Sequence, residues 1–186
     1  VRRLGAVGAV EAALDGFLAE AGALGEKLGP LLVQLPPSLE FAPAVAGRFF
    51  AALRERAAGE VVCEPRHASW WTDPAQALLA GCRVAQVAAD PALSPAAARP
   101  GGWDGLVYYR LHGSPTIYRS AYPPVYLDSL ARTLTRHAEV GTRVWCIFDN
   151  TAEGAAAANA LELSARVAAA PGAEAHGGRV QAARGP

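Results

Sequence analysis

The sequence predicts an α/β protein built on a parallel sheet that is covered by helices on one face. Short apolar runs recur along the chain with a helical pattern or a long loop between them, which is typical of successive βα units. Most of these runs are too apolar for an antiparallel sheet with one face in water. In four of them the polar members keep to one parity, so one face of the sheet is expected to gather polar groups. This pattern favours a curved, barrel-like sheet with a polar lumen at one end over a doubly wound sheet.

The first half of the chain predicts helices and strands in alternation. Apolar residues at helical spacing indicate the first helix, and Gly29-Pro30 ends the pattern. In the second helix an apolar stripe that includes Phe49 and Phe50 lies opposite several arginines. Each helix is followed by an apolar run of strand length. The expected elements are a helix at residues 7–28, a strand at 31–35, a helix at 42–57 and a strand at 60–64.

The second half continues the alternation with three further strands. Thr72-Asp73-Pro74 is typical of a helix cap with proline in the first turn, and Gly81 closes that short helix. A segment rich in proline, alanine and glycine at 91–105 is expected to be a loop, and Thr151 is expected to cap the last helix. The remaining predicted elements are strands at 83–89, 106–111 and 143–148, a loop at 114–124, and helices at 125–139 and from Thr151 to about residue 169.

Polar side chains of one parity follow the strands towards their ends. They are Gln34 in the first strand, Glu64 in the second, Gln86 and Asp90 in the third, and Arg110 and His112 in the fourth. Side chains of alternate residues point to the same face of a strand. We therefore expect Glu64 and Arg110 to point into the lumen, with Gln34 and Gln86 on the same side.

Composition limits the classes of function. A chain of 186 residues with 52% hydrophobic residues is long enough to bury one substantial core, which predicts a single domain. The net charge is zero and the 17 basic residues are scattered, which argues against a broad basic face for nucleic acid. No segment has the length of a membrane span or the order of a signal peptide, so we expect a cytoplasmic protein. The three cysteines lack paired spacing and are expected to be buried, reduced thiols.

Four sequence motifs accompany the predicted strands. They are LGPLLVQLPPSLEF at Leu28 to Phe41, VVCEPRHASWW at Val61 to Trp71, VYYRLHGSP at Val107 to Pro115 and VWCIFDNTAEGAAAANAL at Val144 to Leu161. In this order they resemble the YecE-like family of bacterial and archaeal proteins, a domain of unknown function. The resemblance implies a partial TIM (β/α)8 barrel whose five strands are equivalent to barrel strands four to eight. It also implies an N-terminally incomplete TIM-barrel domain over residues 1–170, and residues 171–186 are predicted to form a disordered tail.

Candidate site residues directly follow the predicted strands, where barrel enzymes keep their chemistry. The candidate catalytic residues are Glu64, His67, His112 and Asp149, because carboxylates and imidazoles exchange protons near neutral pH. The candidate substrate-binding residues are Arg66 and Arg110, which suit a phosphate or carboxylate, Trp70 and Tyr118, which suit a flat group, and Asn150.

Several interpretations of these residues stay open. Glu64 and Arg110 could simply pair inside the barrel, as buried charges do. A metal site is disfavoured because the histidines lack HxH or HExxH spacing, and the sequence identifies no cofactor. The leading hypothesis is a hydrolase or other acid/base enzyme that acts on an anionic, phosphate- or carboxylate-bearing substrate at the barrel mouth. The alternatives are a non-catalytic binding module for an anionic ligand or nucleic acid, and a non-functional fragment.

Overall fold

The computed structural model of the chain describes residues 7–170, and the predicted tail at 171–186 lies outside them. Five α-helices and seven strands make up this part of the chain. The helices are α1 (Val7–Gly22), α2 (Pro43–Arg56), α3 (Asp73–Gly81), α4 (Pro124–Glu139) and α5 (Ala155–Ala168). The strands are β1 (Leu31–Gln34), β2 (Val61–Glu64), β3 (Val84–Gln86), β4 (Ala88–Asp90), β5 (Gly101–Gly102), β6 (Leu106–Leu111) and β7 (Arg143–Phe148).

The parallel strands follow one another in chain order across two hydrogen-bonded sheets. One sheet has the order β1-β2-β3-β5 and the other has the order β4-β6-β7. All neighbours are parallel except β3 and β5. The strand predicted at 83–89 is divided at Val87, whose N–H still donates to the Cys63 carbonyl of β2 at 2.9 Å. The parallel pairing is therefore confirmed, whereas the predicted single sheet is divided into two hydrogen-bonded sheets at the third strand.

Strand β5 is a second departure from the expected elements, because Gly101–Gly102 lies inside the predicted loop at 91–105. It pairs antiparallel with β3, along the edge opposite β2. Gly102 has a φ of +66°, and a Cβ built there would lie 2.5 Å from the Val84 carbonyl oxygen. Only glycine combines this backbone conformation with so close an approach.

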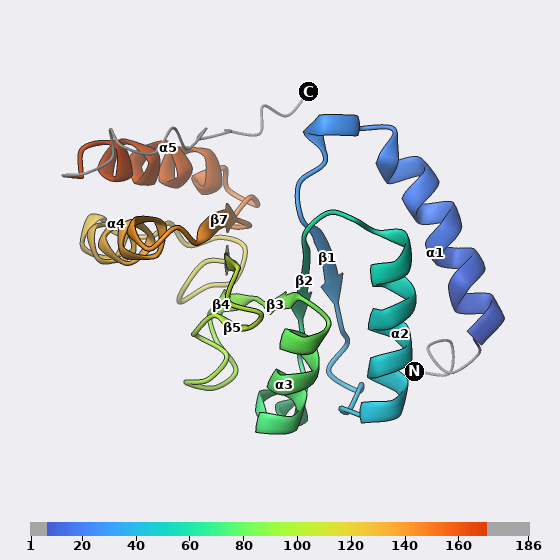
Figure 1. The fold of residues 1–186 in the computed structure, drawn as a ribbon. Helices are drawn as coiled ribbons and strands as arrows, with labels where there is room; N and C mark the ends of the chain where they lie inside the picture. Colours follow the sequence, from blue (N-terminus) through green and yellow to red (C-terminus); the bar gives the residue numbers. More distant parts are fainter. Residues whose placement is uncertain (1–6, 171–186) are drawn as a thin grey trace.

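The helices lie on the outer side of a sheet that is open at both ends. Helices α1, α2 and α3 accompany the β1 to β3 half, and α4 and α5 pack on each other and on β7 (Figure 1). Within residues 7–170, β1 and β7 each pair with one neighbour only, so the described sheet is not a closed barrel. Unpaired backbone groups therefore line both outer edges.

Apolar side chains form separate cores on the two faces of the sheet. On the outer face, Phe50 and Leu53 of α2 and Leu79 of α3 bury the apolar residues of β1, β2 and β3. A second outer cluster lies between α4, α5 and the β6-β7 pair. The inner cluster is built from sheet residues and Trp103, and its buried members are Val62, Ala85, Val87, Leu106 and Tyr108. Burial of apolar surface on both faces stabilises the curved sheet.

Parity predicts the correct face for the polar residues of the first, second and fourth predicted strands. It predicts the wrong face for those of the third strand. Gln34, Glu64 and Arg110 are joined by hydrogen bonds on the inner face, as expected. Gln86 instead accepts a hydrogen bond from Gln76 of α3, so it lies on the helix face. Asp90 also lies there, where it accepts a hydrogen bond from the Tyr122 hydroxyl at 2.7 Å. Buried polar groups can be satisfied on either face, so polarity alone did not identify the inner side of this strand.

Two predicted helix ends differ from the observed ones, and a third lacks its expected capping hydrogen bond. Helix α1 ends at Gly22, and a short 3₁₀ helix at Gly25–Lys27 covers the rest of the expected span. Thr72 precedes α3 as predicted, but its hydroxyl donates to the Ser69 carbonyl and makes no capping hydrogen bond to the helix. Thr151 lies in a turn, and α5 begins after Gly154, whose φ is +78°.

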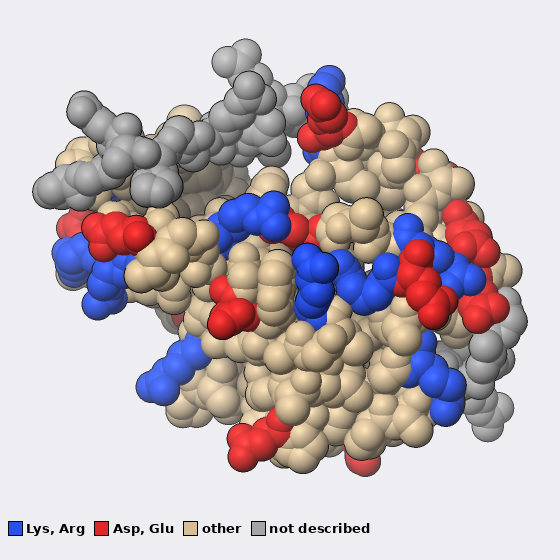
Figure 2. All heavy atoms as spheres, viewed as in Figure 1, with Lys and Arg blue, Asp and Glu red and all other residues tan. Residues whose placement is uncertain are grey.

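The surface has mixed charge over the face that Figure 2 draws, where basic side chains lie close to acidic ones. Among the described residues, no helix is long and apolar enough to cross a membrane. The three cysteines are free thiols. Burial raises the pKa of the Cys63 thiol, and it raises the pKa of Cys146 to about 12. Neither thiol is therefore ionised near neutral pH.

Candidate functional site

Five charged or ionisable side chains meet at the C-terminal ends of β2, β6 and β7. They are Glu64 at the end of β2, Arg66 just beyond it, Arg110 in β6, and His112 and Asp149 directly after β6 and β7. Strands β6 and β7 are neighbours in register, and the Asp149 N–H donates to the Leu111 carbonyl at 2.7 Å. Strand β2 lies two positions from β6, a separation of about 10 Å. The long Arg110 side chain spans this gap.

Glu64 is the centre of the cluster and is 1% exposed. Its Oε2 accepts a hydrogen bond from Arg110 Nη1 at 2.7 Å, and its Oε1 lies 2.5 Å from Arg66 Nη2. Burial acts to raise the pKa of Glu64. Hydrogen bonds from His112 and Arg110 and the charges of both arginines outweigh that effect, so the pKa lies below its ordinary value. Glu64 is therefore a carboxylate near neutral pH.

His112 is 2% exposed and lies between the two carboxylates. Its Nδ1 is 3.0 Å from Asp149 Oδ2, and its Nε2 is 3.2 Å from Glu64 Oε1 and 3.2 Å from Arg66 Nη2. A neutral ring that donates from Nδ1 to Asp149 accepts from Arg66 at Nε2, whereas an imidazolium donates to both carboxylates. Both ring nitrogens are therefore engaged in polar contacts.

Arg110 joins the two acidic residues and one amide. It donates to Glu64 through Nη1, to Asp149 through Nη2 at 2.9 Å, and to Gln34 Oε1 at 3.0 Å. Its side chain is 18% exposed, so water screens these contacts only in part. With a neutral imidazole, two arginines and two carboxylates give the cluster no net charge.

A small cleft adjoins the cluster on the β2 and β4 side. Its polar wall is formed by Glu64, Arg66 and Trp71, and its other lining residues are Pro65, Val87, Ala89, Pro91, Leu93 and Ala97. The empty space amounts to about 240 Å³, part of which is open to solvent. The cleft is therefore mainly apolar, with charged groups at one side.

Two of the predicted site residues lie outside this cluster. His67 caps the 3₁₀ helix at Ala68–Trp71, with Nδ1 2.9 Å from Ser69 Oγ. Its Nε2 is 3.9 Å from Glu40. Trp70 is buried in the outer core, where its indole N–H donates to the Leu39 carbonyl at 2.9 Å. The chain turns after Arg66 into the 3₁₀ helix at Ala68–Trp71, and both side chains thereby lie away from the strand ends.

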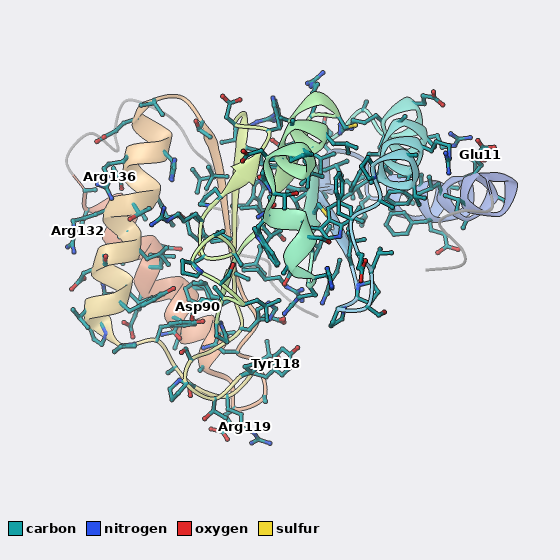
Figure 3. All side chains as sticks on the ribbon, turned by 90° about the horizontal axis from the view of Figure 1, so that it is seen from below. Glu11, Asp90, Tyr118, Arg119, Arg132 and Arg136 are labelled. Carbon is teal, nitrogen blue, oxygen red and sulfur yellow. The ribbon has the colours of Figure 1, made fainter. Side chains whose placement is uncertain are left out.

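The other two predicted binding residues border the cluster in different ways. Tyr118 is half exposed and meets His112 edge to face, with ring centroids 5.9 Å apart. Figure 3 places it on the loop that also carries Arg119. Asn150 is fully buried, and its amide N–H₂ donates to the Ser120 carbonyl and to Asn159 Oδ1, each at 3.0 Å. Asn150 therefore holds the loop after β6 against α5.

Gln34 and Trp71 were not among the predicted site residues. Gln34 has the predicted inner parity in β1, but its contact with Arg110 across β2 could not be predicted from local spacing. Trp71 follows Trp70 directly, and adjacent residues of a short turn point in different directions. This difference in direction is the signal that distinguishes the buried indole of Trp70 from that of Trp71, which lines the cleft.

Two arginines of helix α4 lie apart from the cluster. Arg132 and Arg136 of α4 lie on its outer side, away from Asp90 and Tyr118 (Figure 3). Among residues 7–170, no three His, Cys, Asp or Glu side chains gather as a set of metal ligands.

Solved structures of similar fold come from two bacteria. A DUF72 family protein of Thermotoga maritima has a TM-score of 0.68 and 22% sequence identity, over 83% of this chain and 64% of that one. A DUF72 family protein of Enterococcus faecalis has a TM-score of 0.69 and 19% identity, over 86% of this chain and 66% of that one. This chain thus spans just under two thirds of the length of these proteins. At such identities the likeness establishes the fold alone.

A comparison with curated proteins finds no match. A comparison with protein families matches residues 2–181 to "Protein of unknown function DUF72". The match covers nearly the whole chain and agrees with the fold of the two solved structures. The chain therefore belongs to the DUF72 family.

Proposed function

We propose that this chain provides an acid/base site for a small anionic substrate, and that the reaction is hydrolytic. The observation that carries the proposal is the position of His112 between Asp149 and Glu64, with both ring nitrogens in polar contacts. A carboxylate on one ring nitrogen fixes the tautomer and orientation of a histidine whose other nitrogen moves a proton. The cluster borders the adjoining cleft through Glu64 and Arg66, so we expect substrate to approach from that side.

Each residue of the cluster has a separate role in this proposal. His112 accepts and returns the proton, and Asp149 orients its ring. Glu64 stays ionised and positions Arg66 and Arg110, because its pKa is lowered by their charges and by hydrogen bonds despite its burial. This narrows the hypothesis from the sequence, in which Glu64 itself exchanged protons. Tyr118 covers one side of the His112 ring. His67 and Trp70 have no part in the proposed chemistry.

We propose that residues 1–170 are part of a YecE-like TIM barrel and supply strands equivalent to four to eight. Sequential parallel strands with helices on the outer side support this assignment. Barrel enzymes place catalytic groups at the C-terminal ends of strands, which is where this cluster lies. A cytoplasmic location stays a prediction from the sequence.

A non-catalytic binding module for an anionic ligand is the second candidate. It is favoured by the full pairing of Arg110 with Glu64 and Asp149, since paired charges can serve to organise a site without moving a proton. Nucleic acid is a weaker candidate ligand, because basic and acidic groups are interspersed over the face in Figure 2.

A panel of p-nitrophenyl esters and phosphates tests the catalytic proposal on the 186-residue chain. We expect measurable turnover of at least one substrate. His112→Gln should lower kcat/KM by at least about 100-fold, the usual contribution of general acid–base catalysis. His137→Gln, on α4, is the matched control and should retain the wild-type rate.

The two candidates give different results in this experiment. Equal rates for wild type and His112→Gln would contradict the role of His112. No turnover of the panel, together with saturable binding of an anion that Arg110→Gln abolishes, would favour the binding module.

A further inference from the structure

The main chain at His112 lies where the regular strand pairing stops. Leu111 ends β6, and Gly113 has a φ of +95°, so the chain leaves the strand direction directly after His112. One hydrogen bond, from the His112 N–H to the Asp90 carbonyl at 2.7 Å, extends the pairing of β4 and β6 by one residue. Contacts from outside the sheet are therefore needed to hold the chain beyond this point.

The Tyr122 hydroxyl provides such a contact. It accepts a hydrogen bond from the Gly113 N–H at 2.8 Å and donates one to Asp90 Oδ2 at 2.7 Å. Asp90 thus holds two successive main-chain N–H groups, that of His112 directly and that of Gly113 through the hydroxyl. A buried N–H without a partner is costly, so this bridge favours one conformation of the chain at 112–113.

Tyr122 is itself held from three elements. It is 3% exposed, and its ring stacks on Tyr126 of α4 with centroids 4.6 Å apart and meets Phe148 of β7 edge to face. Asn159 of α5 binds both of its main-chain groups, because Oδ1 accepts from the Tyr122 N–H at 2.9 Å and Nδ2 donates to the Tyr122 carbonyl at 3.1 Å. The hydroxyl is therefore a fixed point to which the Gly113 N–H is tied.

The position of the His112 main chain decides whether its ring reaches both carboxylates. Nδ1 is 3.0 Å from Asp149 and Nε2 is 3.2 Å from Glu64, and these two residues follow different strands. A displacement of the ring towards one carboxylate takes it away from the other. Functional groups have to be held to within about 0.5 Å by supporting hydrogen bonds and packing of this kind.

We propose that Tyr122 is a positioning residue of the candidate site, which fixes His112 for its contacts with Asp149 and Glu64. It acts through Asp90 and the Gly113 N–H on the main chain of the histidine, and not on the reacting atoms. The inference rests on the proposed function for the use that is made of His112. It makes the cluster on the inner face dependent on a hydrogen bond on the helix side of the sheet.

Proton NMR of the 186-residue chain with isotope-labelled histidine tests this inference without requiring turnover. The ring N–H of His112, which is almost fully buried beside a carboxylate, should exchange slowly with water, and His112→Gln identifies its signal. Tyr122→Phe removes only the hydroxyl, and we expect ring N–H exchange at least about tenfold faster, the effect of one net hydrogen bond on an equilibrium. Asp90→Ala removes the acceptor of the same bridge and should act in the same direction. Tyr126→Phe makes the same change in the stacked neighbour and should leave the exchange rate unchanged.

Thermal unfolding of each variant distinguishes the positioning of His112 from general stability. Faster exchange in Tyr122→Phe that still unfolds cooperatively would support the inference. Unchanged exchange in this variant or, if it does not fold, in Asp90→Ala would overturn it. Equal acceleration in Tyr126→Phe, or a wild-type ring N–H that exchanges too fast to be observed, would also overturn it. So would loss of cooperative unfolding in both Tyr122→Phe and Asp90→Ala, because the bridge would then hold the whole fold rather than His112.

The outcomes also separate this inference from the proposed function. If the ester and phosphate panel shows turnover that depends on His112, Tyr122→Phe should lower kcat at least about tenfold and leave KM unchanged, because its hydroxyl does not bind substrate. An unchanged kcat in that case would overturn the inference alone. The expected exchange pattern without turnover of any substrate would support the inference and count against catalysis.

Discussion

Glu64 holds the charged cluster together, because it contacts two arginines and a histidine while almost completely buried. Replacing it with glutamine leaves the two guanidinium groups without their shared counter-charge. We expect Glu64→Gln to lower the free energy of unfolding by about 3–5 kcal/mol, the usual effect of breaking a buried ion pair. Glu40→Gln, at an exposed position, should change it by less than about 0.5 kcal/mol. Urea unfolding of both variants measures the difference.

Acid titration provides a second measurement on Glu64. Its pKa in the folded chain is lowered from about 4.5, so the unfolded chain binds a proton at higher pH than the folded chain does. The stability from Glu64 is therefore fully present above about pH 4.5 and is lost as the pH falls through the folded pKa. We expect the melting temperature of the wild type to drop more steeply with acidification below this pH than that of Glu64→Gln. Parallel curves for the two proteins would show that Glu64 is not held ionised by its partners.

Strand β5 depends on the conformation of one glycine. Alanine at Gly102 combines a positive φ with a Cβ 2.5 Å from a backbone oxygen, so β5 must move away from β3. We expect Gly102→Ala to reduce the free energy of unfolding by at least about 1–3 kcal/mol. Gly16 lies inside α1 with open space around its Cα, and alanine there should stabilise the helix by up to about 1 kcal/mol. Thermal unfolding of the two variants should therefore show shifts of opposite sign.

The elements that could be predicted from the sequence are those with a periodic pattern. Apolar runs located all six parallel strands, although β3 and β4 were predicted as one strand. Of the residues predicted at strand ends, the structure brings Glu64, Arg66, Arg110, His112 and Asp149 together at one edge of the sheet. Strand β5 was missed because two glycines carry no pattern. The faces of Gln86 and Asp90 were wrong because tertiary hydrogen bonds to Gln76 and Tyr122 satisfy them on the helix side.

Residues beyond the strand ends are harder to place from sequence. A strand fixes the direction of its own side chains, but a turn that follows it does not share that periodicity. Arg66 contacts His112 in the cluster. His67 and Trp70 follow within four positions, but the turn into the 3₁₀ helix at Ala68–Trp71 directs both side chains away from the cluster. The spacing of Trp70 and Trp71 in the sequence therefore does not determine which of them lines the cleft.

The open edges of the sheet bear on the behaviour of the whole molecule. Within the described residues, the outer edges of β1 and β7 have no pairing strand, and such edges pair readily with other chains. We expect the 186-residue chain, expressed by itself, to associate as its concentration rises, which sedimentation velocity measures. A monodisperse monomer with a cooperative thermal transition at all concentrations would contradict this expectation.

A charge on one edge strand tests where this association occurs. Leu32 is 37% exposed in β1. Leu32→Lys should reduce self-association, because pairing of two β1 edges would bury the lysine charge. Val140 is 78% exposed just after α4, and Val140→Lys adds the same charge away from both edges. Association that both variants reduce equally would point to a general effect of charge instead.

The division of the third strand at Val87 means that the candidate site spans two separately hydrogen-bonded blocks. Gln34, Glu64 and Arg66 come from the block that ends at β3 and β5, and Arg110, His112 and Asp149 come from the block of β4, β6 and β7. Sheet units of this kind can open one at a time, as local unfolding does in amide hydrogen exchange. The ion pairs of the site then connect two blocks, each of which unfolds locally as a cooperative unit. A ligand held by both blocks would slow amide exchange in each of them, including in strands that it never touches.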